Sequence, residues 1–235
     1  MILNFLKKNY YKKYSKISYS ISNVDLIIDR MFIKKKSGTF IDLGCNHPIK
    51  FNNTYLLYKR GWRGVNIDLD ETSIKEFNKL RSSDFNIRAL VSDKSNEYRK
   101  IYYYHDRSAI NTVSEKLIKY RGAKKDEYKI IEEKSKTLNE IIEISPLKDK
   151  QIDLLSIDIE NHEYEVLNDF DFKKYKINVI VIEILDLEQT KLEIYNQNIE
   201  KIIENKLYKL LIDKNYKLIN WVNSDLIFVK KDFSI

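Results

Sequence analysis

The sequence has few of the residues that shape disulfide-bonded, fibrous and membrane-spanning proteins. Its 235 residues include one Cys, two Pro and five Gly. The single Cys45 excludes an internal disulfide and a cysteine-based zinc site, and the low Gly and Pro content excludes collagen-like and low-complexity chains. No stretch approaches 18 consecutive apolar residues, which excludes a transmembrane helix, and the apolar start before Lys7 is too short for a signal peptide. These absences predict a cytoplasmic protein.

Apolar residues are abundant enough for a large core, and basic residues gather at one end of the chain. The composition is 43% hydrophobic, which excludes a disordered chain. Residues 1–36 hold nine Lys or Arg against two Asp, so this segment carries the whole net charge of +7. The segment is expected to form one or two helices, with either a solvated basic face or a contact to phosphate or an anionic membrane surface. We therefore predict a basic helical N-terminal extension over 1–36 and one domain over 37–235.

Short apolar runs alternate with helical patterns from Thr39 onward, which predicts an α/β fold. Seven strands are expected, near residues 39–44, 64–70, 86–93, 152–160, 178–185, 216–222 and 224–230. Helices are expected near residues 54–59, 71–81, 162–169 and 199–214. The early strands lack polar alternation, which indicates a mostly parallel sheet covered on both faces, and the last two strands predict an antiparallel hairpin. Residues 98–136 show no clear pattern, and we interpret them as a mobile loop over the site.

The first predicted strand ends in IDLGCNHP, at the edge of the sheet where open α/β folds bind cofactors. Gly44 has no Cβ, so the backbone could approach a ligand closely there. A dinucleotide-binding loop needs two further glycines, but the loop continues with Asn46 and Pro48 instead, which argues against a nicotinamide oxidoreductase. An amino-acid-like ligand fits better than a pyrophosphate. The alternative is an ordinary strand-to-loop turn.

Acidic residues end the second and third predicted strands. Asp68 follows Gly44 by about the spacing at which a carboxylate binds the two hydroxyls of a ribose. Asp70 competes for that role, but a helix N-cap suits it better. Asp93 at the end of the third strand could face an adenine amino group, or it could be a turn residue.

Ionisable side chains crowd the end of the fourth strand, in the sequence SIDIENHEYEVL. Charges at the end of a buried strand require a partner or a task. Asp158 stands at the strand tip, and His162 is a base near neutral pH. Glu160 and Glu163 could instead stabilise the start of the following helix, which we prefer for Glu163. The fifth strand places Glu183 beside this group if the two strands are neighbours.

These motifs together resemble the FkbM family of S-adenosylmethionine-dependent methyltransferases. The resemblance covers residues 37–185, through IDLGCNHP, FNNTYLLYKRGWRGVNIDLD, IDLLSIDIENHEYEVLNDFD and INVIVIEI, and D-x-E-x-H-E at Asp158–Glu163 is its most specific part. The sequence departs from it at Asn161, where many members have glycine, and at His47-Pro48, where many have Ile-Gly. The resemblance implies a class I methyltransferase, Rossmann-like fold with a seven-stranded sheet in the domain over 37–235. It also implies O-methylation, commonly of a sugar or polyketide hydroxyl.

The resemblance assigns the residues of these motifs to parts of one expected cofactor site. The methionine part of S-adenosylmethionine is expected at Asp42, Gly44 and Asn46, with the ribose at Asp68 and the adenine near Asp93.

Asp158 and His162 are the candidate bases that take the proton of the acceptor hydroxyl. In the region without clear pattern, His105, Asn111 and Thr112 are expected to contact the acceptor. An exposed loop histidine is the alternative for His105.

The acidic tips of the fourth and fifth strands also suggest a divalent metal ion. Asp158 and Glu183, with His162 nearby, are a donor set that suits Mg²⁺ or Mn²⁺. Catechol O-methyltransferase, a different family with a similar sheet, places metal-binding acids at the same two tips. The alternative for Glu183 is a structural contact to a lysine or a backbone turn.

The sequence therefore predicts O-methyl transfer to a hydroxyl of a glycan or nucleotide-activated sugar. One alternative is an RNA or other nucleic-acid methyltransferase that uses the basic extension, but the basic charge lies only at one end of the chain. The other is a non-catalytic scaffold whose extension binds a membrane or a partner protein.

Overall fold

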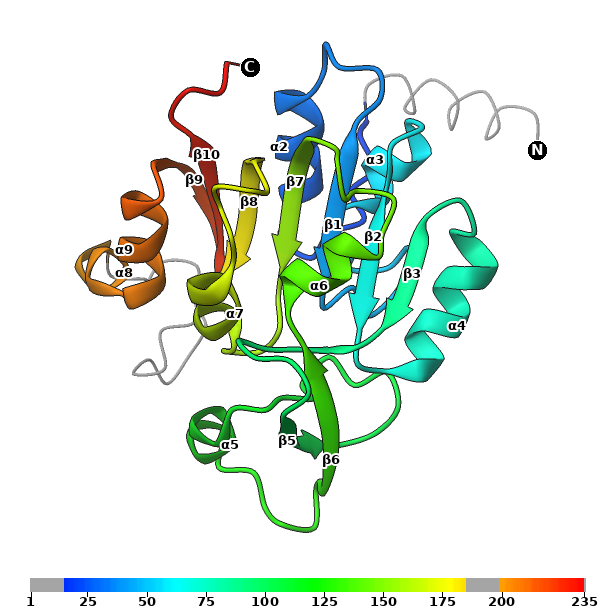
Figure 1. The fold of residues 1–235 in the computed structure, drawn as a ribbon, viewed down its shortest axis with the longest axis vertical. Helices are drawn as coiled ribbons and strands as arrows, with labels where there is room; N and C mark the ends of the chain where they lie inside the picture. The colour runs from blue at the N-terminus through cyan, green and yellow to red at the C-terminus, as the bar shows by residue number, and fades with distance from the viewer. Residues whose placement is uncertain (1–14, 185–198, 235) are drawn as a thin grey trace, which may run out of the picture.

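A seven-stranded sheet forms the centre of the protein in a computed structural model that describes residues 15–184 and 199–234 (Figure 1). Across the sheet, the strands are β3 (Phe85–Arg88), β2 (Arg63–Asp68), β1 (Thr39–Leu43), β7 (Ile152–Ile157), β8 (Ile177–Glu183), β10 (Asp225–Lys230) and β9 (Tyr216–Val222). Neighbouring strands are parallel, except that β10 is antiparallel to both β8 and β9. The predicted sheet with its C-terminal antiparallel hairpin is confirmed.

Helices cover both faces of this sheet, as the apolar strands predict. Strand residues alternate between two cores, so that Phe40 and Leu154 face one side while Ile41 and Leu155 face the other. The first side is covered by α2 (Val24–Met31) and α3 (Tyr55–Lys59). The second is covered by α6 (Leu138–Glu143), α7 (Glu163–Asp169) and α9 (Lys206–Asp213). None of the helices in the described ranges is long and apolar enough to cross a membrane.

Helix α2 lies within the predicted N-terminal extension and packs directly on the sheet. Its Val24 and Ile28 are fully buried in one core with Trp62. Residues 1–14, which carry four of the lysines, lie outside the described residues. The helix expected in this segment is therefore present from Val24 onward.

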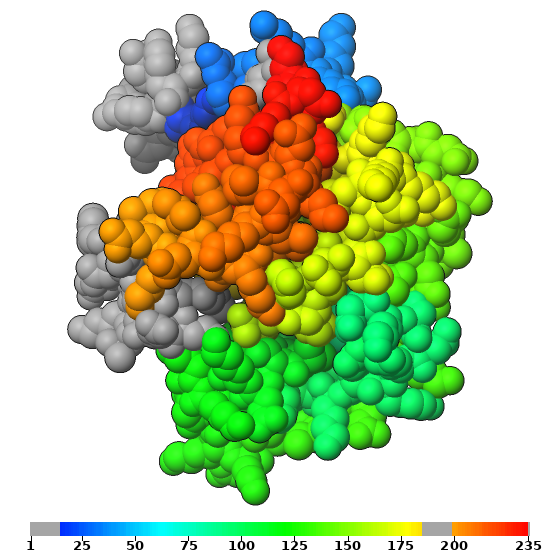
Figure 2. All heavy atoms as spheres, turned by 60° about the vertical axis from the view of Figure 1, so that its left-hand side comes forward, coloured from blue at the N-terminus to red at the C-terminus, as the bar shows by residue number. Residues whose placement is uncertain are grey.

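Residues 98–136 are not a loop, so that interpretation was wrong. They contribute β5 (Tyr98–Tyr103), α5 (Glu115–Arg121) and β6 (Lys129–Lys136). With β4 (Leu90–Val91) these strands form a second sheet, in the order β4-β6-β5. This insert, defined here as residues 90–136, lies beyond the carboxyl ends of the parallel strands (Figure 1), and Figure 2 shows its green residues gathered at one end of the molecule.

Two other predicted elements are divided. The third predicted strand leaves the main sheet after Arg88, and its next residues, Leu90 and Val91, pair with β6 instead. The predicted C-terminal helix is two helices, α8 (Ile199–Glu204) and α9, because Asn205 has an extended ψ of 135° and caps α9 through its side chain. In contrast, α4 (Glu71–Leu80) begins where expected, with Asp70 as its N-cap.

A buried arginine joins α4 to β2 and to the loop after β1. Arg81 is fully buried, and its Nε donates to Asp84 Oδ2 at 2.9 Å. Its Nη1 donates to Asn52 Oδ1 at 3.2 Å and to Thr54 Oγ1 at 3.0 Å. Asp84 also accepts from the backbone of Gly64 at 3.0 Å. This network fixes α4 and the loop after β1 against the sheet.

We expect Arg81→Met to lower the free energy of unfolding by about 3–5 kcal/mol, because it leaves the Asp84 charge buried without its partner. Arg88→Met is the control, since Arg88 is 39% exposed in its ion pair with Glu133 and such pairs contribute up to about 1 kcal/mol. Urea denaturation measures both variants. Equal effects at the two positions would contradict the structural role of Arg81.

Candidate active site

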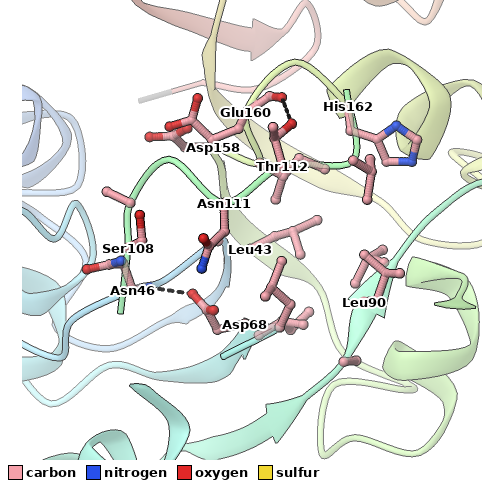
Figure 3. A pocket seen from close by; sticks show the side chains of 18 of the residues that line it. Leu43, Asn46, Asp68, Leu90, Ser108, Asn111, Thr112, Asp158, Glu160 and His162 are labelled. Carbon is pink, nitrogen blue, oxygen red and sulfur yellow. Dashed lines mark hydrogen bonds between the residues drawn. The ribbon is translucent and has the colours of Figure 1, made fainter. Parts of the chain in front are cut away.

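A cavity opens where β1, β2 and β7 end, beneath the insert. It has about 920 Å³ of empty space, including its open mouth. Gly44 and Asn46 line it from the end of β1, Asp68 from β2, and Asp158 from β7. Figure 3 shows Asn46, Asp68 and Asp158 around one space, with Thr112 of the insert beside Glu160. The sequence prediction of a site at this edge of the sheet agrees with the position of the cavity.

Asp68 lies in the middle of this cavity, and both of its carboxylate oxygens accept backbone N–H groups. Oδ2 accepts from Asn46 at 2.8 Å and Oδ1 from Asp70 at 2.8 Å. Burial raises the pKa of Asp68 to about 6, although the two N–H groups oppose this change. Each oxygen keeps a lone pair for a ligand hydroxyl. Asp68 is therefore oriented by the backbone and still able to bind a diol.

The carboxylate of Asp70 accepts its hydrogen bonds outside the cavity, and Asp70 is the helix N-cap that the sequence analysis favoured. Its Oδ1 caps α4 by accepting from Ser73 N at 2.8 Å. Its Oδ2 accepts from the hydroxyl of Tyr103 and from the backbone of Arg107, each at 2.9 Å. Asp70 thus ties the insert to α4 and does not line the cavity.

Gly44 and Asp42 have structural tasks that the sequence did not reveal. Gly44 has φ +83°, and a Cβ there would lie 1.8 Å from the carbonyl oxygen of Asp158. The close approach of the β7 tip therefore requires glycine at position 44, whereas the sequence analysis explained this glycine by the approach of a ligand. Asp42 does not line the cavity, because it is buried and accepts from Asn52 Nδ2 at 2.9 Å and Thr54 Oγ1 at 2.7 Å. Asn46 does line the cavity.

The chain turns sharply after Asp158 through two left-handed residues. Glu160 has φ +59° and Asn161 has φ +70°, a region that L-residues other than Asn and Asp seldom adopt. This conformation explains why glycine suits position 161 and why Asn is an acceptable replacement. The side-chain amide of Asn161 also donates to Ser114 Oγ at 3.0 Å, which fastens the turn to the insert.

Asp158 and Glu183 lie side by side, as predicted, because Ile157 pairs with Ile182 in the β7–β8 ladder. Enclosure by protein, followed by the charge of Glu183, raises the pKa of Asp158 well above its usual range. The pKa of Glu183 rises to about 8 for the same main reason. Asp158 nevertheless has an exposed side that faces the cavity.

The expected metal ligands are only partly together. Glu183 accepts a hydrogen bond from Ser224 Oγ at 2.9 Å, which is a structural contact but to a side-chain hydroxyl and not to the lysine or backbone turn that the alternative named. Within residues 15–184 and 199–234, no three His, Cys, Asp or Glu side chains are grouped as metal ligands. The Mg²⁺ or Mn²⁺ site stays a prediction.

His162 lies toward another part of the cavity from Asp158. Figure 3 shows its ring on the side of Leu90. Its Nε2 is 2.9 Å from Ser92 Oγ, and burial lowers its pKa, so the imidazole is neutral near pH 7. Asp93 does not line the cavity, because its carboxylate accepts from Ser92 at 2.8 Å and pairs with Arg99 at 2.7 Å. The two predicted bases, Asp158 and His162, thus line the same cavity from different sides.

Two of the three predicted acceptor residues line the cavity. Thr112 donates to the carbonyl of Glu160 at 2.8 Å, which holds the insert against the turn after β7. Asn111 accepts from the backbone of Tyr104 at 2.8 Å within the insert. His105 is exposed and does not line the cavity, as its alternative proposed.

Several cavity residues have no signal in the sequence. Ile21, Leu90 and Ser108 line the cavity but belong to no motif, and Phe51 begins the segment FNNTYLLYK of the family resemblance without a role assigned to it. An apolar side chain exposed at a cavity mouth cannot be distinguished in sequence from a core residue or a scattered surface residue.

The family of the chain follows from a comparison with domain models. The methyltransferase FkbM domain matches residues 42–210, which is more than half of the chain. The chain belongs to the FkbM methyltransferase family. Its cofactor is accordingly S-adenosylmethionine, and its sheet is the class I methyltransferase sheet that the resemblance implied.

Other comparisons give only distant likenesses. No curated protein matches the sequence of this FkbM domain. Among solved structures, a TehB-like S-adenosylmethionine-dependent methyltransferase from Corynebacterium glutamicum is 11% identical, with 97% of each chain covered and a TM-score of 0.45. The fibrillarin pre-rRNA processing protein of Methanococcus jannaschii is 11% identical, with 84% of this chain and 68% of that chain covered and a TM-score of 0.44. Likenesses this weak carry no inference about the substrate.

Glu163 is a buried acid with a structural task at the start of α7. It is 4% exposed, and its Oε1 accepts from the backbone of Ile159 at 2.8 Å, which agrees with the structural interpretation. Burial raises its pKa to about 8. The folded protein therefore keeps a proton on Glu163 that the unfolded chain releases above the usual glutamate pKa.

We expect the free energy of unfolding to fall as the pH rises from about 5 to 8, because the unfolded state then binds fewer protons than the folded state. Glu163→Gln keeps the acceptor for Ile159 without titrating, so it should flatten this decline and add on the order of 2 kcal/mol at pH 8. Exposed Glu204→Gln is the control and should follow the wild type. Urea denaturation at several pH values measures the slopes. A steeper decline in Glu163→Gln would show that Glu163 is ionised in the folded protein.

Proposed function

We propose that this FkbM domain transfers the methyl group of S-adenosylmethionine to a hydroxyl oxygen of a carbohydrate, either a glycan or a nucleotide-activated sugar. The observation that supports this proposal most is the position of Asp158. It faces the same cavity as Asp68, its pKa is raised, and it lies at the strand tip beside the Gly44 loop. A diol-binding acid and a potential base thus line one cavity.

The residues of the cavity fit the cofactor. Asp68 would accept both ribose hydroxyls, because each of its oxygens retains a free lone pair. The apolar side chains of Leu90 and Val91 would hold the adenine, with His162 beside them. The methionine part would lie along Gly44 and Asn46. His162 is then a cofactor-binding residue in this proposal, which replaces its predicted role as a base.

When bound, S-adenosylmethionine supplies a methyl group on a positively charged sulfur. Methyl transfer to the acceptor oxygen would leave S-adenosylhomocysteine and would require the acceptor hydroxyl to lose its proton. Asp158 would take that proton, since a carboxyl with a raised pKa is a stronger base than an ordinary aspartate. Glu183 lies beside Asp158 at the neighbouring strand tip, and its charge would help to keep the pKa of Asp158 raised. The insert would cover the reacting atoms and reduce their access to water.

An acceptor screen with methyl-labelled S-adenosylmethionine tests the proposal. The panel should contain glycosides, nucleotide-activated sugars, RNA and small alcohols, and mass spectrometry should locate the label. We expect label on a carbohydrate oxygen. Label on RNA that disappears when residues 1–14 are removed would favour the nucleic-acid alternative. Absence of binding to S-adenosylhomocysteine would favour the scaffold.

Asp68→Ala should weaken binding of S-adenosylhomocysteine by roughly 10–100-fold, because a charged hydrogen-bond partner contributes about 1.5–3 kcal/mol. Asp158→Asn is the informative comparison, since it should bind S-adenosylhomocysteine nearly as well as the wild type but transfer no methyl group. Exposed Asp169→Ala controls for nonspecific loss of charge. Calorimetry measures binding, and thermal melting shows that each variant is folded. If Asp68→Ala binds S-adenosylhomocysteine with unchanged affinity, another residue must bind the ribose.

A further inference from the structure

Two large apolar side chains are exposed at the mouth of the cavity. Phe51 is 61% exposed and Ile21 is 69% exposed, and both line the cavity. They come from different segments, one from the loop after β1 and the other from the chain before α2. Exposed apolar side chains at a cavity mouth are typical of a surface that receives a ligand.

The Phe51 ring is held outward by a fixed backbone. Its φ of +54° is a conformation that bulky residues rarely adopt without a cause. Both neighbours are anchored, because Lys50 N donates to His47 Nδ1 at 2.9 Å and Asn52 N donates to the carbonyl of Tyr19 at 3.0 Å. The exposure of the ring is therefore a consequence of how the loop is anchored.

The charges around the cavity are unfavourable for an anionic acceptor. None of the described residues that line it is Lys or Arg, whereas Asp158 and Glu160 both line it. Arg121 lies close by, but it pairs with Glu160 at 2.5 Å. The ammonium of Lys50 lies at the rim, 4.5 Å from the centre of the Phe51 ring. A phosphate bound inside the cavity against this lining would lie near carboxylates, with Lys50 only at the rim, which is energetically costly.

From the exposed ring and the lining charges, we infer that the acceptor is an uncharged sugar that packs its C–H face on Phe51. The inference rests on the proposed transfer to a carbohydrate hydroxyl and selects the glycan over the nucleotide-activated sugar. One face of a pyranose ring presents C–H groups that pack well on an aromatic ring, while its hydroxyls project from the edge. Such an orientation leaves a hydroxyl free to reach Asp158.

Matched acceptors test the charge part of this inference. Initial rates of methyl transfer should be measured for methyl glycosides and for nucleoside diphosphate derivatives of the same sugars. We expect at least one glycoside to be methylated with a kcat/KM at least about tenfold above that of its charged derivative. Preference for the charged derivative would overturn the inference while supporting the proposed function.

Variants of Phe51 test the role of the ring. Phe51→Ala should raise the KM for the glycoside by about tenfold or more, because it removes most of the apolar contact, while kcat changes little. Phe51→Tyr should retain the wild-type KM. Tyr98→Ala is the matched control, because Tyr98 is a 66% exposed aromatic residue with Lys134 Nζ 5.4 Å from its ring, and it does not line the cavity. Lys50→Ala should leave the preference for the uncharged sugar intact.

A binding measurement separates this inference from the proposed function. Saturation-transfer NMR with methyl glycosides and S-adenosylhomocysteine detects sugar binding without turnover. A signal that is lost in Phe51→Ala supports the inference even if no methyl transfer occurs. Absence of a signal for every glycoside, or an unchanged signal in Phe51→Ala, would overturn it.

Discussion

The close contact between the ends of β1 and β7 is the constraint on which the site depends. Leu43 O accepts from Asp158 N at 3.0 Å, and Ile67 O accepts from Gly44 N at 2.9 Å. These bonds join the tips of β2, β1 and β7, and they bring Gly44 so near the Asp158 carbonyl that no Cβ fits between them. The backbone therefore fixes the separation of Asp68 and Asp158, the residues to which we assign the ribose and the acceptor proton. The hydrogen bonds from Arg81 to Asn52 and Thr54 also fix the loop that follows Gly44 after β1.

A second consequence is that acids gather around the tips of β7 and β8. Asp158, Glu160, Glu163 and Glu183 all have raised pKa values, chiefly because burial disfavours their charged forms. A cationic ligand at this end of the cavity would stabilise their charged forms again. The positively charged sulfur of S-adenosylmethionine fits that electrostatic environment, whereas an anionic acceptor beside these carboxyl groups does not.

The sequence predicts the sheet well because its signals are local and strong. Apolar strands such as β7 and β8 have no polar alternation, and the spacing from Gly44 to Asp68 reflects one strand–helix–strand unit. The insert was missed because β6 is mostly exposed and rich in Lys and Glu, and its partner β5 lies far away along the chain. Local patterns contain little information about such a pairing.

Side-chain roles were harder to predict than positions. Asp42 and Asp93 stand at strand ends like Asp68, but Asn52 and Thr54 bind the first and Ser92 and Arg99 bind the second, outside the cavity. The direction of His162 depends on Ser92, a distant residue in the sequence.

A crystal structure of the domain with S-adenosylhomocysteine tests the central claim most directly. The account predicts the ribose hydroxyls on the Asp68 carboxylate, the adenine near Leu90 and His162, and the sulfur at the Asp158 end of the cavity. A cofactor bound in the reverse direction, or outside this cavity, would contradict it.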